Sequence, residues 1–263
     1  MNKPQHEIDE DRRRPGITLD GLLTLQSSGV VDAPVTVNPT GQVRANSSFG
    51  TLNGDVTVLR DGDGAGRLSV VANNAHLNGT GVVTNSGLIE GGAISRNAST
   101  FFDLSLTNTA DGVVRAFRNG TPTNTFFQIT EDVQNNGVME AVGANLYFTT
   151  ARVQNAGLLH AVDNEEASKL IFINGTRVTD SGGTTTVDGG LSRLEVSAAA
   201  NVELGTLSFT NGGGGFVSFP MWGGMWLSFY MLIDHPSSMR RETRNFDRLR
   251  LAYPETTDIL LSL

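Results

Sequence analysis

The amino-acid sequence predicts an all-β protein, a parallel β-solenoid of about eight coils, and three observations support this fold class. One phrase (an apolar residue, a spacer, Asn, a spacer, Gly, a spacer, an apolar residue) recurs at 83–89, 133–139 and 153–159. Polar turn residues recur at steps of 20 to 27 residues, which is the length of one solenoid coil. Short stretches also alternate apolar and polar residues with period two, as strands with one buried face do. The turn residues are Asn38, Asp61, Asn85, Asn108, Asn135, Asn155, Asp180 and Asn201.

The composition agrees with a β-rich chain and excludes some classes of function. Of the 263 residues 31 are Gly, and Gly and Asn supply tight turns while Val, Thr and Phe supply strands. The net charge of −8 argues against general nucleic-acid binding, which needs a basic surface. The chain has no Cys, so it has neither a disulfide framework nor a Cys-based metal site.

The N-terminal region is expected to differ from the repeats. Residues 1–15 are polar, carry Arg12, Arg13 and Arg14, and are expected to be disordered. Residues 16–29 are expected to form a first strand or a cap over the open end of the solenoid. No secretory signal is visible, because the apolar stretch 16–25 is short and is interrupted by Asp20. We expect that the chain is not exported or that its true start lies upstream.

Residues 30–211 are predicted to form the repeat region, in which Val, Leu, Ile and Phe point inward. Stacked coils would place Asn85, Asn135 and Asn155 above one another, so that their side chains hydrogen-bond along the axis as an Asn ladder. The glycines two positions later, at 87, 137 and 157, are expected to hold equivalent places with positive φ. On that interpretation, replacing Gly137 by Val costs about 1–3 kcal/mol of stability.

Residues 212–263 are predicted to lie outside the stack, because the composition changes abruptly. Residues 204–233 carry no charge, and a basic stretch follows at 239–250. The uncharged run 216–233 just reaches the length of a membrane span, although Pro220 and several glycines weaken it. The segment is expected to be a cap over the last coil, a membrane anchor, or a terminus that does not natively continue the repeat.

One segment resembles the start of a calcium-binding loop, but the match fails. Asp61-Gly-Asp63-Gly-Ala-Gly66 has the first two carboxylates of such a loop. The loop needs an oxygen ligand at its fifth position and a Glu at its twelfth, where this chain has Ala65 and Ala72. A glycine-rich turn between coils is the better interpretation.

Other chemically active residues are scattered along the chain. Asp163, Glu165 and Glu166 form a small acidic cluster that is expected to be a solvated loop, although paired carboxylates can act on sugars. His76 and His160 lie in strand-like contexts without the spacing of metal ligands, and are expected to be lone surface histidines. The sequence therefore predicts no catalytic, cofactor-binding or metal-binding residues.

The repeats resemble those of bacterial secreted β-solenoids, the autotransporter passengers and filamentous-haemagglutinin-like adhesins. The phrases that carry the resemblance are Val-Thr-Asn-Ser-Gly-Leu-Ile-Glu-Gly (83–91), Val-Gln-Asn-Asn-Gly-Val-Met-Glu-Ala (133–141) and Val-Gln-Asn-Ala-Gly-Leu-Leu-His-Ala (153–161). The resemblance covers roughly residues 30–210 and implies a right-handed parallel β-helix, secreted or on a cell surface, that serves in adhesion or as a stalk. The chain departs from the pattern because it has neither a visible signal peptide nor a C-terminus like an outer-membrane barrel.

Two functions from different classes remain open. The first is a non-catalytic adhesin, stalk or structural repeat domain, extracellular or at the cell surface, with glycans or proteins as partners and possible membrane association through 216–233. The alternative is a β-helical polysaccharide lyase or glycoside hydrolase, a class that stacks carboxylates with Arg or Lys on one face of consecutive coils. A groove lined by three or more acids together with an Arg would favour the enzyme.

Overall fold

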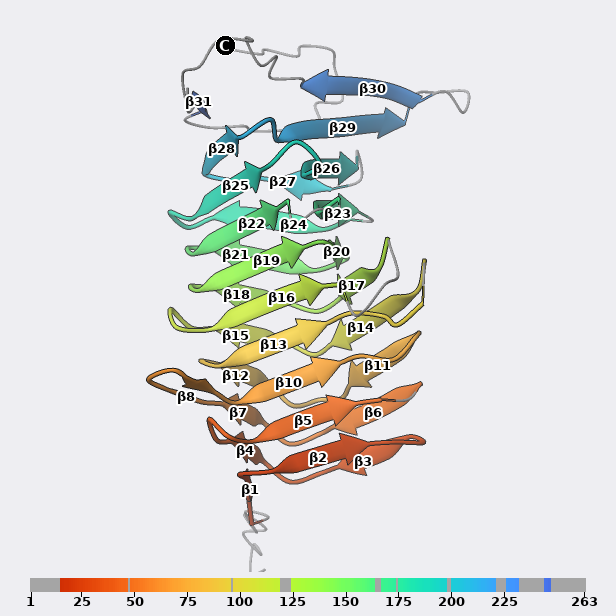
Figure 1. Cartoon of the computed structure of the whole chain (residues 1–263), viewed down its shortest axis with the longest axis vertical. Coiled ribbons are helices and arrows are strands. Elements are labelled where there is room, and N and C mark those ends of the chain that lie inside the picture. Colours follow the sequence, from red (N-terminus) through yellow and green to blue (C-terminus); the bar gives the residue numbers. More distant parts are fainter. Residues whose placement is uncertain are drawn as a thin grey trace, which may run out of the picture.

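The protein is a three-sided parallel β-solenoid, described here from a computed structural model (Figure 1). The structure describes residues 15–46, 48–95, 97–118, 124–163, 167–173, 175–197, 200–220, 226–231 and 244–246. All regular elements in these ranges are β-strands, and the predicted all-β parallel β-helix is confirmed.

Three long sheets form the sides of the solenoid, and the chain visits them in the order A, B, C in every coil. Sheet A consists of β1 (Ile17–Leu19), β4 (Val35–Val37), β7 (Val56–Val58), β12 (Val83–Asn85), β15 (Leu106–Asn108), β18 (Val133–Asn135), β21 (Arg152–Asn155), β24 (Arg177–Asp180) and β27 (Asn201–Val202). Sheet B consists of β2 (Leu22–Leu25), β5 (Gln42–Ala45), β10 (Arg67–Val70), β13 (Leu88–Gly91), β16 (Val113–Phe117), β19 (Val138–Val142), β22 (Leu158–Val162), β25 (Thr184–Asp188), β28 (Thr206–Thr210) and β31 (Arg244–Phe246). Sheet C consists of β3 (Gly29–Val31), β6 (Phe49–Leu52), β11 (Ala75–Asn78), β14 (Ser99–Asp103), β17 (Phe126–Ile129), β20 (Asn145–Thr149), β23 (Lys169–Ile173), β26 (Arg193–Ser197), β29 (Gly214–Pro220) and β30 (Trp226–Met231).

The coil is right-handed, as parallel crossovers almost always are. In Figure 1 the strands of sheet B run from left to right across the front while the chain rises from β1 toward β30. One excursion interrupts the third coil, where β8 (Arg60–Asp61) and β9 (Gly64–Ala65) form a short antiparallel hairpin.

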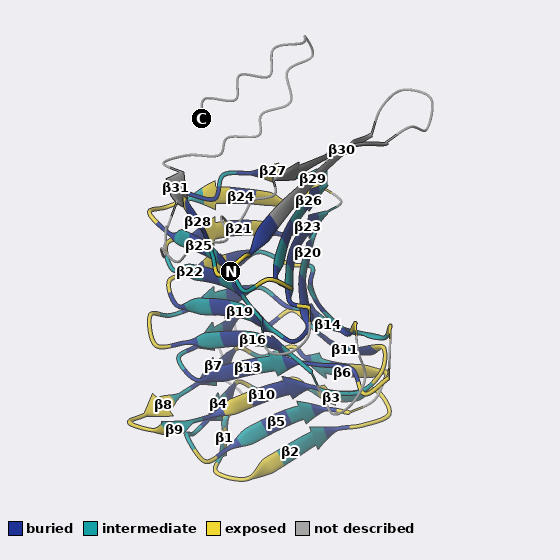
Figure 2. Ribbon diagram, turned by 45° about the horizontal axis from the view of Figure 1, so that its top comes forward, coloured by how far each residue is buried: buried dark blue, intermediate teal, exposed yellow. Residues whose placement is uncertain are grey.

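Alternate residues of each strand point into the solenoid and form one continuous apolar core. Strands such as β16 and β19 alternate between partly exposed and buried residues, and Figure 2 shows the same alternation along the whole stack. Parallel register places equivalent residues of successive coils above one another, so the inward side chains form columns that run along the axis. The core column of sheet C includes Phe148 and Phe172, whose rings stack with centroids 5.0 Å apart.

Small side chains of sheet B make room for the large ones of sheet C. The inward column of sheet B contains Ala116, Ala141 and Ala161 at equivalent places in successive strands. Gly91 lies in the same column one coil earlier, and a Cβ atom there would collide with the ring of Phe127. Small residues of sheet B therefore pack against large residues of sheet C across the core.

The predicted Asn ladder is confirmed. Asn85, Asn108, Asn135 and Asn155 are cross-strand partners in sheet A, and all four are buried. Each Nδ2 donates to the Oδ1 of the next Asn, at 2.8 Å, 2.8 Å and 2.7 Å in turn. The ladder satisfies amide groups that would otherwise be buried without partners. Asp180 occupies the next place in the column, and Asn155 Nδ2 has no partner among the described residues.

The glycines that follow the ladder hold equivalent places, but the expectation that they have positive φ is wrong. The residue after each glycine donates its N–H to the carbonyl of the glycine one coil earlier; Val138 does so to Gly112, and Leu158 to Gly137. None of Gly87, Gly137 and Gly157 lies in the left-handed region. Glycine is required there because a Cβ atom on Gly137 would collide with carbonyl oxygens of the coil before it, those of Thr109 and Gly112.

The turn residues Asn38, Asp61 and Asn201 are not in the register that their spacing predicted. Val37 and Val58 occupy the column of Asn85, so Asn38 lies one position beyond it and Asp61 lies in the β8–β9 hairpin. Asn201 pairs with Arg177 at the start of β24, not with Asp180. A polar turn residue marks the corner of a coil. Corners differ in length, however, so the turn residues of different coils need not pair with one another.

The parallel stack begins earlier and ends later than the sequence boundaries of 30 and 211. Residues 17–31 supply a complete first coil whose strands pair in parallel with β4, β5 and β6, so 16–29 are not a separate cap. β29 continues sheet C in parallel with β26, so the stack extends to Pro220. The change in composition does not mark the boundary of the stack. A strand can continue a sheet with apolar residues alone, without the Asn-Gly phrase.

Beyond β29, the described strands β30 and β31 run in the reverse direction at the far ends of sheets C and B. β30 pairs antiparallel with β29, and β31 pairs antiparallel with β28. The described part of the run 216–233 therefore consists of strands, and residues 1–14, 221–225, 232–243 and 247–263 lie outside the described residues. Among the residues that are described, no helix is long and apolar enough to cross a membrane.

The glycine column predicts a position-specific cost of adding one methyl group. We expect Gly137→Ala to lower the free energy of unfolding by about 1–3 kcal/mol, because its Cβ overpacks against the coil below. Gly21→Ala is the matched control: Gly21 holds the same place in the first coil, and a Cβ there meets nothing within 4 Å. Equal effects in urea unfolding would show that close approach is not what selects glycine.

The ladder predicts different costs at its middle and at its end. Asn108→Val removes both the acceptor of Asn85 and the donor to Asn135, so we expect a loss of about 1–3 kcal/mol for each group left unsatisfied. Asn155→Val removes only the acceptor of Asn135 and also deletes an unpartnered Nδ2, so its loss should be smaller. The measurement is urea unfolding of both variants, and an equal or larger loss for Asn155→Val contradicts the ladder account.

Candidate functional site

A column of charged and polar residues runs along the outer face of sheet B. It occupies the third place of each strand, just after the inward apolar residue, as in Leu-Ile-Glu-Gly (88–91) and Val-Met-Glu-Ala (138–141). Parallel register makes these residues direct neighbours at the strand spacing of about 4.8 Å. The charged column consists of Arg44, Ser69, Glu90, Arg115, Glu140 and His160.

Hydrogen bonds and ion pairs join the members of the charged column between coils. Ser69 Oγ donates to Glu90 Oε1 at 2.9 Å, and Arg67 lies 3.8 Å from the same oxygen. Arg115 Nε donates to Glu140 Oε1 at 2.6 Å. Both glutamate side chains are only 14% exposed, so these pairs are less screened than fully exposed ones.

Two apolar columns flank the charged one on the same face. Val113, Val138 and Leu158 lie on one side, and Phe117, Val142 and Val162 on the other. All six are partly exposed, so the outer face is apolar on both sides of a polar stripe. The apolar neighbours shield the charged groups from water. The charge of each group is therefore balanced by a partner in a neighbouring coil.

His160 is the member of the column whose environment most alters its titration. Burial lowers the pKa of His160, while the nearby carboxylates of Glu140 and Asp188 oppose that shift. Asp188 is held by Thr210 Oγ1 and Asn211 Nδ2, each donating at 2.6 Å. Glu140, His160 and Asp188 therefore lie near one another on three consecutive coils.

The chemistry available to the charged column is limited by its internal pairing. Glu90 and Glu140 stand two coils apart, so their backbones are separated by about 10 Å, with Arg115 between them. A pair of carboxylates at a comparable side-chain distance can act on a glycosidic bond when one of them holds a proton. The described residues contain no group of three or more His, Asp or Glu placed to hold a metal ion.

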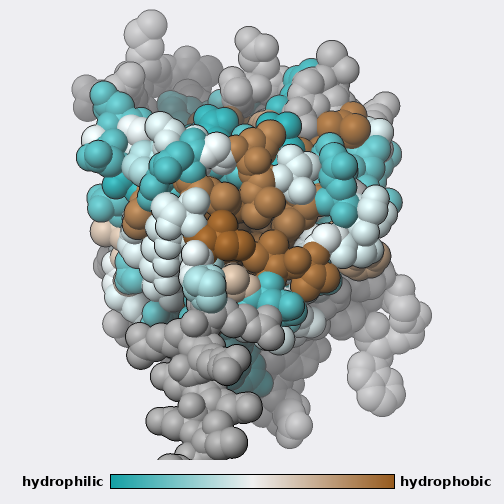
Figure 3. Space-filling model, turned by 90° about the horizontal axis from the view of Figure 1, so that it is seen from below, coloured by the Kyte–Doolittle hydropathy of each residue, from teal (hydrophilic) through white to brown (hydrophobic). Residues whose placement is uncertain are grey.

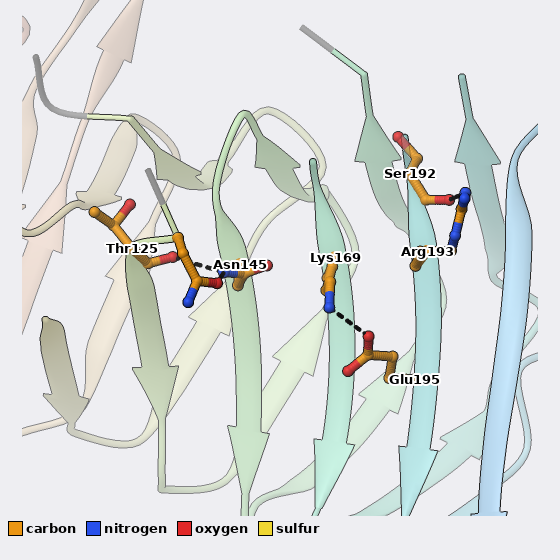
Figure 4. A network of polar contacts seen from close by, with 7 residues as sticks. Thr125, Asn145, Lys169, Ser192, Arg193 and Glu195 are labelled. Carbon is orange, nitrogen blue, oxygen red and sulfur yellow. Dashed lines mark hydrogen bonds and ion pairs between the residues drawn. The ribbon is translucent and has the colours of Figure 1, made fainter. Parts of the chain in front are cut away.

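A second polar cluster lies on sheet C, as Figure 4 shows. Lys169 Nζ of β23 lies 2.6 Å from Glu195 Oε1 of the neighbouring β26. Arg193 donates to the backbone carbonyl of Ser192 at 2.7 Å, and Asn145 Nδ2 donates to that of Thr125 at 3.1 Å. The Lys169–Glu195 and Asn145–Thr125 contacts join neighbouring coils, whereas Arg193 and Ser192 are adjacent residues of one coil.

The residues singled out in the sequence do not come together. The Asp61–Gly66 segment forms the β8–β9 hairpin, as a glycine-rich turn would. Asp163 accepts a backbone hydrogen bond from Leu191, while Glu165 and Glu166 lie outside the described residues.

His76 is not the lone surface histidine that the sequence suggested. Its Nδ1 lies 2.7 Å from Asp103 Oδ2, and its ring stacks on Phe101 with centroids 4.0 Å apart. Phe49 stacks on the other side at 5.0 Å, so the three rings form an aromatic ladder on the outer face of sheet C. The partners come from neighbouring coils 25 to 27 residues away, which a single strand pattern does not reveal.

The charged column was missed in the sequence, although a signal for it existed. The repeated phrases end in Ile-Glu-Gly, Met-Glu-Ala and Leu-His-Ala, with an ionisable residue at the same place each time. Arg115 lies at that place in a looser copy, Val-Val-Arg-Ala (113–116). Aligning the repeats one residue at a time would have shown the column.

Comparisons with protein-family models, curated proteins and solved structures give no significant match to this chain. They therefore add no support for the autotransporter-like families that the repeats resemble.

His160 predicts a pH dependence of stability. Its folded pKa lies below the unfolded value of about 6.5, so the unfolded state binds more protons on acidification. Its neutral form stabilises the fold at higher pH, and this contribution is lost as the pH falls below about 6.5 and through the folded pKa. We expect the urea midpoint to fall less between pH 7.5 and about pH 5 in His160→Gln than in the wild type. Parallel falls in the two proteins would contradict this assignment.

Proposed function

We propose that the protein is a non-catalytic β-solenoid that acts outside the cell or at its surface, as an adhesin, a stalk or a structural repeat domain. The observation that carries this proposal is that charged side chains of the outer faces pair with residues of neighbouring coils. Such pairs connect successive coils along the axis of the solenoid. The pairs are Arg115 with Glu140, Arg152 with Asp132, Lys169 with Glu195, and His76 with Asp103.

The shape supports the same proposal. A continuous core and a continuous hydrogen-bonded stack make an elongated body whose length grows with each repeat, which suits a spacer or a display surface. The outer faces present repeated columns of polar and aromatic side chains, a broad surface for glycans or proteins. The resemblance of the repeats to those of secreted adhesins points in the same direction.

A polysaccharide lyase or glycoside hydrolase is the second candidate, and one observation favours it. Glu90, Arg115 and Glu140 stack on one face of three consecutive coils, with His160 on the next. Carboxylates stacked with an Arg on consecutive coils were expected of such an enzyme, but the charged column supplies two acids, fewer than the three or more that would favour it. Against it, Arg115 Nε already donates to Glu140 Oε1 at 2.6 Å, so this carboxylate has a partner within the charged column.

One experiment separates the two candidates. The full chain is immobilised and tested for binding to neutral and acidic glycans and to extracellular proteins, and the same glycans are assayed for new reducing ends or unsaturated products. We expect binding without turnover. Turnover that falls about 100-fold or more in Glu140→Gln, but not in the matched Glu195→Gln variant on sheet C, would establish the enzyme instead.

A further inference from the structure

The outer face of sheet B carries apolar columns in its middle coils, from β13 to β22. Figure 3 looks along the solenoid axis and shows apolar side chains gathered in the centre, with hydrophilic side chains around them. The face of sheet B, which is turned to the viewer in Figure 1, departs from this arrangement. Partly exposed apolar residues form its first and last columns: Val113, Val138 and Leu158, and Phe117, Val142 and Val162. A contiguous apolar surface of this kind marks an interaction site.

The charged column between the apolar ones alternates in chemistry from coil to coil. From β13 to β22 its members are Glu90, Arg115, Glu140 and His160. Carboxylates that accept hydrogen bonds therefore alternate with side chains that donate them, since a His ring carries an N–H group in either protonation state. Read in the opposite direction, the column offers a donor at every place where it offered an acceptor.

Arg115 has hydrogen-bond donors that its own chain does not use. A guanidinium group has five N–H donors. Arg115 Nε donates to Glu140 at 2.6 Å, and among the described residues no other group binds this guanidinium. The Arg115 side chain is also 42% exposed. Its remaining N–H groups are therefore available to a carboxylate of another molecule.

We propose that the outer face of sheet B binds the same face of a second copy of this chain, in a side-by-side dimer of antiparallel solenoids. The two-fold axis lies in the interface, parallel to the strands, midway between β16 and β19. Such an axis reverses the order of the coils and keeps the direction of the strands, so each column meets itself in reverse. Arg115 then faces Glu140 of the second copy, and Glu90 faces His160 of the second copy.

The other places of the face match under the same axis. In the first column Val113 faces Val138, and Leu88 faces Leu158, so apolar side chains meet apolar ones. Farther from the axis, polar side chains of the charged column meet polar ones, Ser69 with Thr186 and Arg44 with Ser208. The apolar columns supply burial, and the charged column fixes the register.

The charges also select the antiparallel arrangement over a parallel one. An axis along the solenoid would place Glu90, Arg115 and Glu140 each opposite the same residue of the second copy, and like charges in contact repel. Sheet A makes no such selection, because its outer column in these coils is neutral: Thr84, Thr107, Gln134 and Gln154.

The size of the face suits a dimer that uses most of the sheet. The strands from β5 to β28 extend about 38 Å along the axis and are about 16 Å long, which gives about 600 Å² per copy before side-chain relief is counted. A standard interface takes about 800 Å² from each partner. The proposed axis maps this range of strands onto itself, so the whole length of the face is in contact.

The oligomeric state of the full chain tests the proposal, measured by analytical ultracentrifugation over a range of concentrations. We expect a dimer for the wild type. Arg115→Glu and Glu140→Arg each place like charges across the axis, so either variant alone should dimerise at least about tenfold more weakly. An equimolar mixture of the two should form a heterodimer, because one copy then carries acids at both central places and the other carries arginines at both.

Two further variants serve as controls. Lys169→Glu also reverses the charge of a cation that pairs with a Glu of the next coil, but on sheet C, and it should leave the dimer affinity unchanged. The double variant Arg115→Glu/Glu140→Arg keeps opposite charges within each copy and between copies, so it should dimerise as the wild type does. Circular dichroism of the dilute single variants shows whether they are folded.

Spin labels report the orientation without altering the face. The chain lacks Cys, so single cysteines can be introduced at Thr18 and Thr107, which lie in one outward column of sheet A. Thr107 belongs to the coil of β16, beside the two-fold axis, and Thr18 lies four coils away, about 19 Å. In the antiparallel dimer the two labels at Thr18 are separated by about 38 Å more along the axis than the two labels at Thr107.

Three results would overturn the proposal. The first is a wild-type monomer at high concentration. The second is a mixture of the two folded single variants that forms no heterodimer, which shows that the charged columns do not face each other. The third is a dimer in which the labels at Thr18 are no farther apart than those at Thr107, which shows a parallel pair or contact through an end of the stack. If the single variants do not fold, the labels and the double variant decide.

Discussion

Hydrogen bonding between successive coils at a fixed rise is the constraint on which the rest of this structure depends. Each coil must place a strand above the corresponding strand of the coil before it, so any residue type that suits one place is repeated there. The Asn ladder is the clearest consequence, because the Nδ2 group of each buried Asn donates to the Oδ1 atom of an Asn at the same place in the next coil. The glycine column follows from the same rise, since backbones approach too closely there for a Cβ atom.

The same constraint explains why ionisable residues of the outer faces meet their partners in neighbouring coils. Register brings the third residue of each sheet B strand together, and alternation of sign along the column turns that proximity into attraction, as between Arg115 and Glu140. His160 follows two apolar residues, as Glu140 does, but carries no permanent charge and takes its pKa from burial. A column of this kind is first a device for stacking, and any ligand must compete with the pairs already made within it.

The repeat made the architecture predictable, because stacking of the coils favours the Asn-Gly phrase and burial of one strand face produces the period-two alternation. Asn85, Asn135 and Asn155 could be placed in one ladder from spacing alone. The features that the sequence did not predict also have physical causes. Corners vary in length, so Asn38 and Asn201 were placed out of register, and steric closeness between coils, not left-handed backbone, selects Gly137. His76 could not be assigned partners because Asp103 and Phe101 come from the next coil. The charged column was visible in the repeats but required their exact alignment.

A solenoid has no closed core, so its ends pose a problem that the repeat itself cannot solve. Each inner coil is covered by its two neighbours, whereas the first and last coils each lack one. At the C-terminal end, reversal of the chain supplies β30 and β31, and antiparallel pairing ends two of the three sheets. At the N-terminal end, β1, β2 and β3 are the outermost described strands of their sheets, and the backbone N–H and C=O groups of Leu22 and Thr24 point away from β5.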